Sequence, residues 1–143
     1  MSERAPRSLS TPTMSPALTA THAAKRPTRV MLVDDHPSFR ASARWLLETE
    51  GYVVVAEAAS GESALDLVDD ANPELVLLDV GLPGIDGFQV AAALRARFSR
   101  ARIVLISSRD LRDLGPERVR ACGASGFVHK AALSRAAISA IAP

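Results

Sequence analysis

The chain has 143 residues, with 17 Lys and Arg, 16 Asp and Glu and one cysteine. This length suits one ordinary domain and is short for two, and the formal net charge of +1 indicates no class of partner. A single cysteine excludes an internal disulfide and a Cys-rich zinc site, and no apolar run approaches the ~20 residues of a membrane span. We therefore expect a soluble, single-domain cytoplasmic protein that has no membrane partner.

The first 28 residues differ in composition from the rest. They hold four prolines and nine Ser or Thr and show no apolar periodicity. They therefore cannot bury enough apolar surface to offset the entropy of ordering the chain. We predict a disordered Ser/Thr/Pro/Ala-rich basic tail over 1–28 and a folded domain over 29–143. Residues 30–143 carry 12 basic and 15 acidic groups, a net −3, which argues against direct nucleic-acid binding. An organellar transit peptide and a start at Met14 stay open for the tail.

From Arg29 onward, short apolar runs alternate with segments of helical periodicity. Runs that are apolar on both faces suit buried parallel strands. The predicted strands are 30–33, 52–56, 75–78, 103–106 and 126–129. The predicted helices are 39–50, which ends before Gly51, then 60–71 with Ser60 as N-cap, 86–97, 116–121 and 133–141. Five strand–helix pairs predict an α/β three-layer sandwich with helices on both faces of a parallel sheet.

Polar residues stand where the predicted strands end. The carboxyl ends of parallel strands meet at one edge of a sheet, so Asp34, Asp35, Asp79, Ser107 and Lys130 should converge there. Each residue alone is explained by helix capping or by solvation, but capping alone does not explain the whole set. Two carboxylates about 4 Å apart repel by roughly 4 kcal/mol at an effective dielectric constant near 20. Three acids with one ammonium therefore favour a bound cation.

The donor set at this edge suits Mg²⁺, which takes one or two carboxylates and keeps several waters. The three histidines lie apart in the sequence and predict no zinc cluster, and residues 81–84 lack the phosphate-loop pattern. A metal, an ammonium and a hydroxyl all favour phosphoryl oxygens, and an ionised carboxylate can form an aspartyl-phosphate. We expect Asp79, on a central strand, to be the phosphoacceptor, and Asp34 and Asp35 to hold the metal.

The segments VMLVDDHPSFR, ELVLLDVGLPGIDGF, RIVLISS and GASGFVHK together resemble the receiver domains of bacterial two-component response regulators, of the CheY-like superfamily, over residues 29 to about 141. The resemblance implies a flavodoxin-like (βα)5 fold with the sheet order 2-1-3-4-5. It also implies that Asp79 takes a phosphoryl group from a histidine kinase or phosphotransfer protein. The implied Mg²⁺ ligands are Asp34, Asp35, Asp79 and the backbone carbonyl of Val80.

The same resemblance implies a conformational switch. Lys130 and the Ser107 hydroxyl would contact the phosphoryl group, and the Phe127 ring would rotate into the space that Ser107 leaves. This would repack the surface formed by 116–121, 126–129 and 133–141, where a downstream protein partner binds. Such a protein signals and is not an enzyme, apart from catalysing its own phosphotransfer and dephosphorylation.

The Asp-Asp-His-Pro start, the Gly-Leu-Pro-Gly loop and the lack of proline after Lys130 look most like the NarL/FixJ type, whose members usually continue into a DNA-binding helix-turn-helix domain. The chain stops at Pro143, so we expect a receiver without an output domain that acts through protein contacts. Leu82 for Met, Ser107 for Thr and the short last helix depart from the common pattern.

Three alternatives remain open for the function. The chain could be the receiver part of a DNA-binding regulator whose helix-turn-helix domain is absent, or a pseudo-receiver that is not phosphorylated. It could also be a Mg²⁺-dependent phosphohydrolase with Asp34 as nucleophile. The last alternative is disfavoured because position 36 is His, where such enzymes need Asp.

Overall fold

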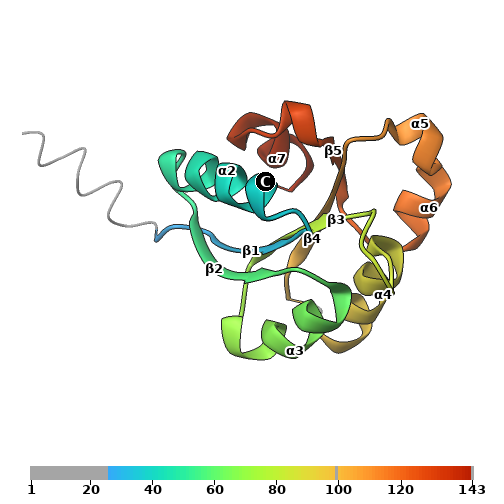
Figure 1. Cartoon of the computed structure of the whole chain (residues 1–143), viewed down its shortest axis with the longest axis horizontal. Coiled ribbons are helices and arrows are strands. Elements are labelled where there is room, and N and C mark those ends of the chain that lie inside the picture. Colours follow the sequence, from blue (N-terminus) through green and yellow to red (C-terminus); the bar gives the residue numbers. More distant parts are fainter. Residues whose placement is uncertain (1–25, 99, 143) are drawn as a thin grey trace, which may run out of the picture.

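The computed structural model describes residues 26–98 and 100–142. These residues form a five-stranded sheet in the order β2-β1-β3-β4-β5, with every neighbouring pair parallel (Figure 1). The strands are β1 (Arg29–Val33), β2 (Val53–Ala58), β3 (Leu75–Asp79), β4 (Arg102–Ser107) and β5 (Gly126–His129). The helices are α2 (Pro37–Thr49), α3 (Gly61–Ala71), α4 (Gly87–Arg97), α5 (Leu111–Leu114), α6 (Pro116–Ala121) and α7 (Arg135–Ile141), with a 3-10 turn η2 (Lys130–Ala132). The predicted flavodoxin-like sheet order is confirmed.

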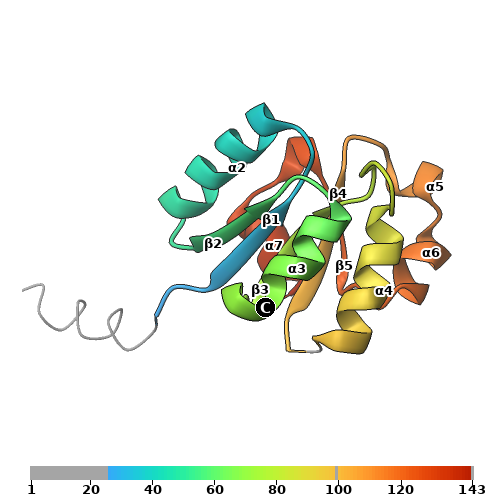
Figure 2. The same cartoon turned by 60° about the horizontal axis from the view of Figure 1, so that its bottom comes forward.

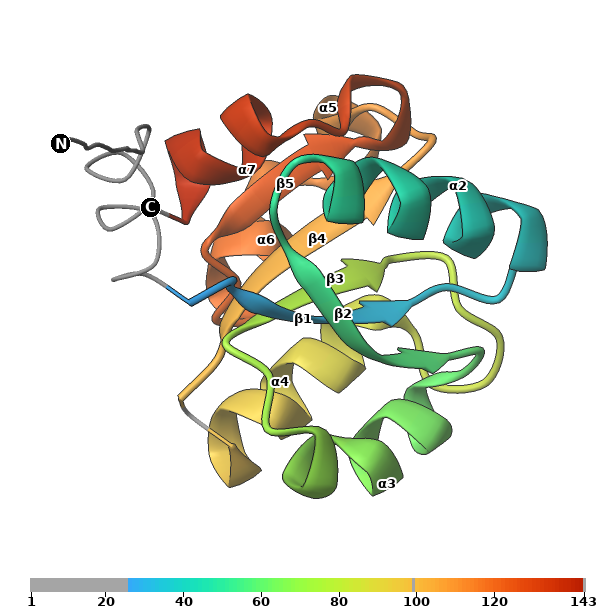
Figure 3. The same ribbon diagram turned by 90° about the vertical axis from the view of Figure 1, so that its left-hand side faces the viewer.

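The central strands are buried on both faces, which explains their continuous apolar runs. Met31 of β1 packs on the side covered by α3 and α4, whereas Val30 packs on the side covered by α2 and α7 (Figure 3). Helices α3 and α4 lie side by side on their face of the sheet (Figure 2). Each buried Leu-sized side chain contributes about 1.5–3 kcal/mol, so the sheet that carries the strand ends is held from both sides.

The start of α4 is set by a capping box directly after the loop that follows β3. The Asp86 carboxylate accepts a hydrogen bond from the Gln89 amide at 3.0 Å, and the Gln89 side-chain oxygen accepts one from the Asp86 amide at 2.9 Å. These two bonds satisfy amides that the first turn of a helix leaves without partners. The loop carrying residues 80–86 is therefore held at both of its ends, by β3 and by α4.

The segment between β4 and β5 differs from the prediction. The expected helix at 116–121 is present as α6, but it is preceded by a separate turn, α5. Gly115 lies between them with a φ of 95°, a conformation that favours glycine, and Pro116 has no amide hydrogen to continue α5. The sequence shows both residues, but the four residues of α5 were too few to show helical periodicity.

Three residues of the predicted tail are described by the structure. The Arg26 guanidinium donates two hydrogen bonds of 3.1 Å to the Glu74 carboxylate, and the Thr28 carbonyl accepts a hydrogen bond from Val53 at 3.0 Å. Residues 1–25 of the predicted tail lie outside the described residues. Across 26–98 and 100–142, no helix is long and apolar enough to cross a membrane.

Candidate functional site

The carboxyl edge of the sheet gathers the polar residues that the sequence singled out. Asp34 follows β1, Asp79 ends β3, Ser107 ends β4, and Lys130 begins η2 directly after β5. Within the described ranges, the buried polar or charged side chains are Asp34, Asp79 and Ser107, with exposed fractions of 0%, 4% and 5%. Burial of a polar or charged group without partners is costly, so all three side chains need partners at this edge.

Lys130 joins the first and third strands through two carboxylates. Its Nζ lies 2.5 Å from Asp34 Oδ2 and 3.5 Å from Asp79 Oδ2. The same ammonium lies 4.5 Å from the centre of the Phe39 ring of α2, within cation–π range. Phe39 therefore covers the ammonium from the α2 side.

The charge on Asp79 is unfavourable in this setting. Burial raises the pKa of its carboxyl, and the nearby Asp34 carboxylate raises that pKa further. A hydrogen bond of 3.2 Å from the Gly81 amide to Asp79 Oδ1 and the charge of Lys130 oppose the rise without cancelling it. An additional cation at this edge would therefore favour the ionised, nucleophilic form of Asp79.

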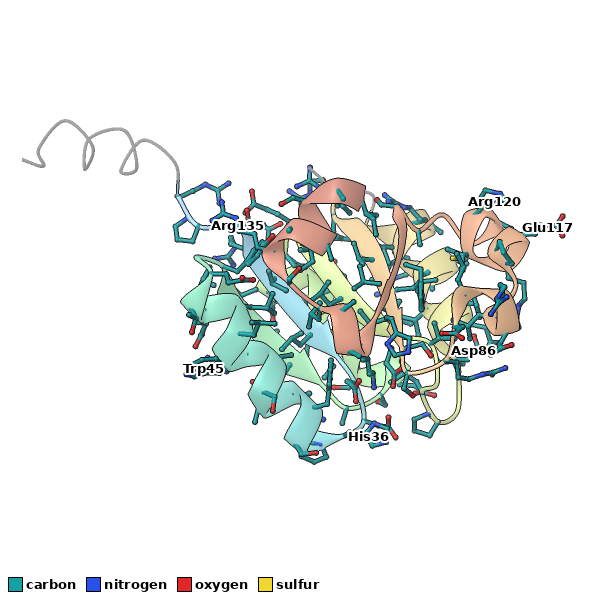
Figure 4. All side chains as sticks on the ribbon, turned by 90° about the horizontal axis from the view of Figure 1, so that it is seen from above. His36, Trp45, Asp86, Glu117, Arg120 and Arg135 are labelled. Carbon is teal, nitrogen blue, oxygen red and sulfur yellow. The ribbon has the colours of Figure 1, made fainter. Side chains whose placement is uncertain are left out.

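The Asp34 and Asp35 carboxylates both lie close to the ring of His36, the residue that follows them. Asp34 Oδ1 accepts a hydrogen bond of 2.8 Å from the His36 amide. The His36 ring lies beyond the end of β1 at the start of α2 (Figure 4), with Nδ1 3.0 Å from Asp34 Oδ1 and 3.3 Å from Asp35 Oδ1. Its position immediately after the acidic pair was the only signal in the sequence.

The donors at this edge fit a divalent cation. One ligand atom each from Asp34, Asp35, His36 and Asp79 can be chosen so that all four lie within 4.8 Å of one another. Asp34 Oδ2 and Asp35 Oδ1 are buried and accept no hydrogen bond from the described residues. The Lys130 ammonium lies beside the first of these oxygens and the His36 ring beside the second, in both cases without hydrogen-bond geometry. Asp35 Oδ1, which has no donor and lies away from the ammonium, is a suitable ligand for Mg²⁺.

The Val80 carbonyl, the fourth expected ligand, is held by the start of α4. It accepts a hydrogen bond of 3.0 Å from the Gly87 amide, while the Val80 amide donates to the Ile106 carbonyl at 3.0 Å. A carbonyl oxygen has two lone pairs, so this bond leaves one for another partner. The backbone of residue 80 is thus fixed between β4 and α4.

The two expected switch residues lie on neighbouring strands. Leu105 of β4 is opposite Phe127 of β5, and Ser107 is opposite His129, so Ser107 and Phe127 are on the same face of the sheet. The Ser107 hydroxyl accepts a hydrogen bond of 3.0 Å from the Arg109 amide. Beside it is a pocket of about 220 Å³ that Ser107 lines together with residues of the loop after β3, α4, α5 and α6. Phe127 is half-buried against the adjoining core.

A doubly wound parallel sheet with an acidic cluster and an ammonium at its carboxyl edge defines the flavodoxin-like, CheY-like class of domain. The family model of the response regulator receiver domain matches residues 30–142. The chain belongs to this family, and so to the signalling proteins of two-component systems.

Similar proteins agree with this assignment. The transcriptional regulatory protein NarL of Mycobacterium tuberculosis is 42% identical over 103 residues, which are 71% of this chain and 47% of that protein. The DNA-binding transcriptional activator EvgA of Escherichia coli is 36% identical over 100 residues, covering 70% and 48%. The chain spans about half the length of these curated relatives. The solved signal receiver domain of NarL from M. tuberculosis superimposes with a TM-score of 0.71 at 35% identity, covering 82% of this chain and 98% of that one.

Proposed function

We propose that Asp79 accepts a phosphoryl group from a histidine kinase or phosphotransfer protein, with Mg²⁺ held by Asp34, Asp35, Asp79 and the Val80 carbonyl. The observation that carries the proposal is the position of the Lys130 ammonium, 2.5 Å from Asp34 and 3.5 Å from Asp79. A cation held against the acceptor carboxylate is what a transferring phosphoryl group requires for its negative oxygens. Receiver domains bind Mg²⁺ at an acidic pocket, and the clustered carboxylates of Asp34, Asp35 and Asp79 suit that ion.

The transfer itself needs a nucleophile, a route for the proton and charge compensation. A carboxylate oxygen of Asp79 attacks phosphorus, the new O–P bond forms a mixed anhydride, and the P–N bond of the donor phosphohistidine breaks. The departing imidazole nitrogen keeps the bond electrons and takes a proton from solvent. Bound Mg²⁺ would offset the carboxylate charges and polarise the phosphoryl oxygens. Lys130 and Ser107 would also contact the phosphoryl oxygens.

The phosphoryl group adds about −1.5 to −2 of charge and three strong acceptors beside Ser107. The Ser107 hydroxyl, which now accepts from the Arg109 amide at 3.0 Å, becomes a donor to a phosphoryl oxygen. A neutral hydrogen bond is worth about 0.5–1.5 kcal/mol and one to a charged group about 1.5–3 kcal/mol. Replacing the neutral hydrogen bond by one to the charged phosphoryl group therefore favours the reoriented Ser107 hydroxyl by about 1 kcal/mol. This is enough to shift the balance between the two conformations of the domain. Phe127 then moves into the vacated space, and the α6–β5–α7 surface presents a different face to its protein partner.

The test is phosphorylation of matched variants. The wild type, Asp79→Asn and the control Asp66→Asn, an exposed acid of α3, are incubated with Mg²⁺ and each labelled histidine kinase of the host. We expect hydroxylamine-sensitive label on the wild type and the control and none on Asp79→Asn. Label that persists in Asp79→Asn, or no label from any kinase, contradicts the proposal. The second result would favour a pseudo-receiver.

A second candidate function concerns the output. The relatives NarL and EvgA are transcriptional regulators, and the chain spans 47% and 48% of their lengths. We therefore also propose that this domain controls a DNA-binding partner, either in the same polypeptide or in another one. The test is the reading frame beyond codon 143. A helix-turn-helix sequence there supports control within one chain, and an immediate stop codon refutes it in favour of a separate partner.

A further inference from the structure

The His36 ring contacts both members of the acidic pair. Its Nδ1 lies 3.0 Å from Asp34 Oδ1 and 3.3 Å from Asp35 Oδ1. The backbone holds the ring there, because the His36 amide donates to Asp34 Oδ1 at 2.8 Å and Pro37 begins α2 directly afterwards. The His36 side chain is 62% exposed, so the ring can adjust its orientation while its Cα stays in place. No core packing requires a histidine at this position.

Lys130 contacts one oxygen of the Asp34 carboxylate, and His36 contacts the other. The ammonium takes Oδ2 at 2.5 Å, and the ring and amide of His36 lie against Oδ1. A cation that approaches the acidic pair is repelled by the ammonium and therefore uses Oδ1, the oxygen next to the imidazole nitrogen. On this side the chain offers a nitrogen donor in addition to the carboxylates.

We propose that Nδ1 of His36 is itself a metal ligand, which makes this a mixed oxygen and nitrogen site that favours Co²⁺ and Zn²⁺ over Mg²⁺. The proposal rests on the metal site of the proposed function. Ligand atoms bound to one ion at about 2.1 Å are at most about 4.2 Å apart. The four donor atoms already lie within 4.8 Å of one another, so shifts of a few tenths of an ångström bring them into one coordination sphere.

The selectivity follows from the chemistry of the nitrogen donor. Imidazole suits Zn²⁺, Co²⁺ and Ni²⁺, whereas Mg²⁺ prefers oxygen ligands and keeps its waters. Ligation by Nδ1 requires that the ring proton be on Nε2, one of the two neutral tautomers of histidine. Mg²⁺ would therefore use the carboxylates and the Val80 carbonyl, while a transition metal would also use His36.

The experiment compares metal affinities of the full chain by calorimetry for Mg²⁺, Co²⁺ and Zn²⁺. The variants are His36→Ala and the control His129→Gln, a histidine at the same edge that bonds to the Ser108 carbonyl. Loss of an outer partner of a metal ligand costs about 10–100-fold in affinity, and loss of a ligand costs no less. We expect His36→Ala to weaken Co²⁺ and Zn²⁺ by about 10-fold or more and Mg²⁺ by less than about 3-fold, and to change the visible absorption of bound Co²⁺. His129→Gln should change none of these.

Each other result overturns the proposal in an identifiable way. Equal weakening of all three metals would mean that His36 only positions the carboxylates, and unchanged affinities would mean that it plays no part. Kinase labelling of His36→Ala with Mg²⁺ separates the two proposals. If the label remains while the metal preference is absent, the proposed function stands and this inference fails. If the wild type binds no metal, the metal site of the proposed function fails as well.

Discussion

The first turn of α4 lies against the backbone of the strand end that carries Asp79, the proposed phosphoacceptor. A Cβ added to Gly87 would lie 2.4 Å from the Asp79 carbonyl oxygen and 2.7 Å from Val80 Cα. Both contacts are with backbone atoms, so no side-chain rotation relieves them. Gly87→Ala must therefore push α4 away from β3 or displace the residues that form the site.

The cost follows from the kind of contact. Overpacking of this type costs about 1–3 kcal/mol, and Ala regains part of this through its higher helix propensity, at most about 1 kcal/mol. We expect Gly87→Ala to lower the free energy of unfolding by about 1–2 kcal/mol, which corresponds to a Tm lower by about 4–8 °C for a domain of this size. Because the Gly87 amide also holds the Val80 carbonyl at 3.0 Å, Mg²⁺ affinity should fall too.

The assay is urea unfolding followed by far-UV circular dichroism. The single tryptophan, Trp45, is 70% exposed on the outer side of α2 (Figure 4) and would report poorly on folding. Gly81→Ala is the matched control, because its added Cβ has Asp79 Oδ1 as its nearest atom at 3.9 Å, an ordinary contact. That control should stay within about 0.5 kcal/mol of the wild type. Equal stabilities of the two variants would refute the close approach of α4 to β3.

Three further substitutions test the contacts around the site. Lys130→Met removes the partner of the buried Asp34 carboxylate, so urea unfolding without metal should show a loss of about 3 kcal/mol; a loss below about 1 kcal/mol contradicts the buried pair. Asp79→Asn removes a carboxyl whose pKa is raised in the folded protein. As the pH rises above 3.8, this carboxyl ionises more readily in the unfolded chain than in the folded one, so it increasingly destabilises the fold. The variant should therefore have the higher Tm at neutral pH in EDTA, with a gap that closes as the pH falls toward 3.8, and a gap independent of pH counts against this. Ser134→Ala removes the N-cap of α7 and should cost about 1 kcal/mol in thermal unfolding. The exposed Ser139→Ala in the same helix should cost less than half of that.

The sheet could be predicted because its strands are short runs without polar interruption. Leu75–Leu78 is buried at every position, and such a run allows few alternatives to a central parallel strand. The convergence of Asp34 and Asp79 followed from topology alone, since both stand at carboxyl ends. Elements with few residues were predicted less well, and α5 and η2 were missed because a single turn has no periodicity to detect.

Side-chain partners within the site could not be predicted in the same way. The sequence places Lys130 after β5, but it does not show that the ammonium lies nearer to Asp34 than to Asp79. That preference depends on the η2 turn and on the Phe39 ring that covers the ammonium. The role of His36 depends similarly on the turn between β1 and α2, which folds the ring back over the two preceding residues. Both contacts arise from backbone turns that carry no repeating pattern.

Two hydrogen bonds hold the start of α7 against α2, and they determine which part of the proposed output surface can move when Asp79 is phosphorylated. The Glu50 carboxylate accepts a hydrogen bond of 2.6 Å from the Arg135 amide, and the Arg135 guanidinium donates to the Glu50 carbonyl at 3.1 Å. These bonds tie the start of α7 to the end of α2, on the side of the sheet away from the pocket beside Ser107. Helices α5 and α6, by contrast, have four and six residues, line that pocket and are separated by Gly115. Short helices with a break between them are stabilised mainly by their packing, so reorientation of Ser107 favours movement of α5 and α6 while α7 stays in place.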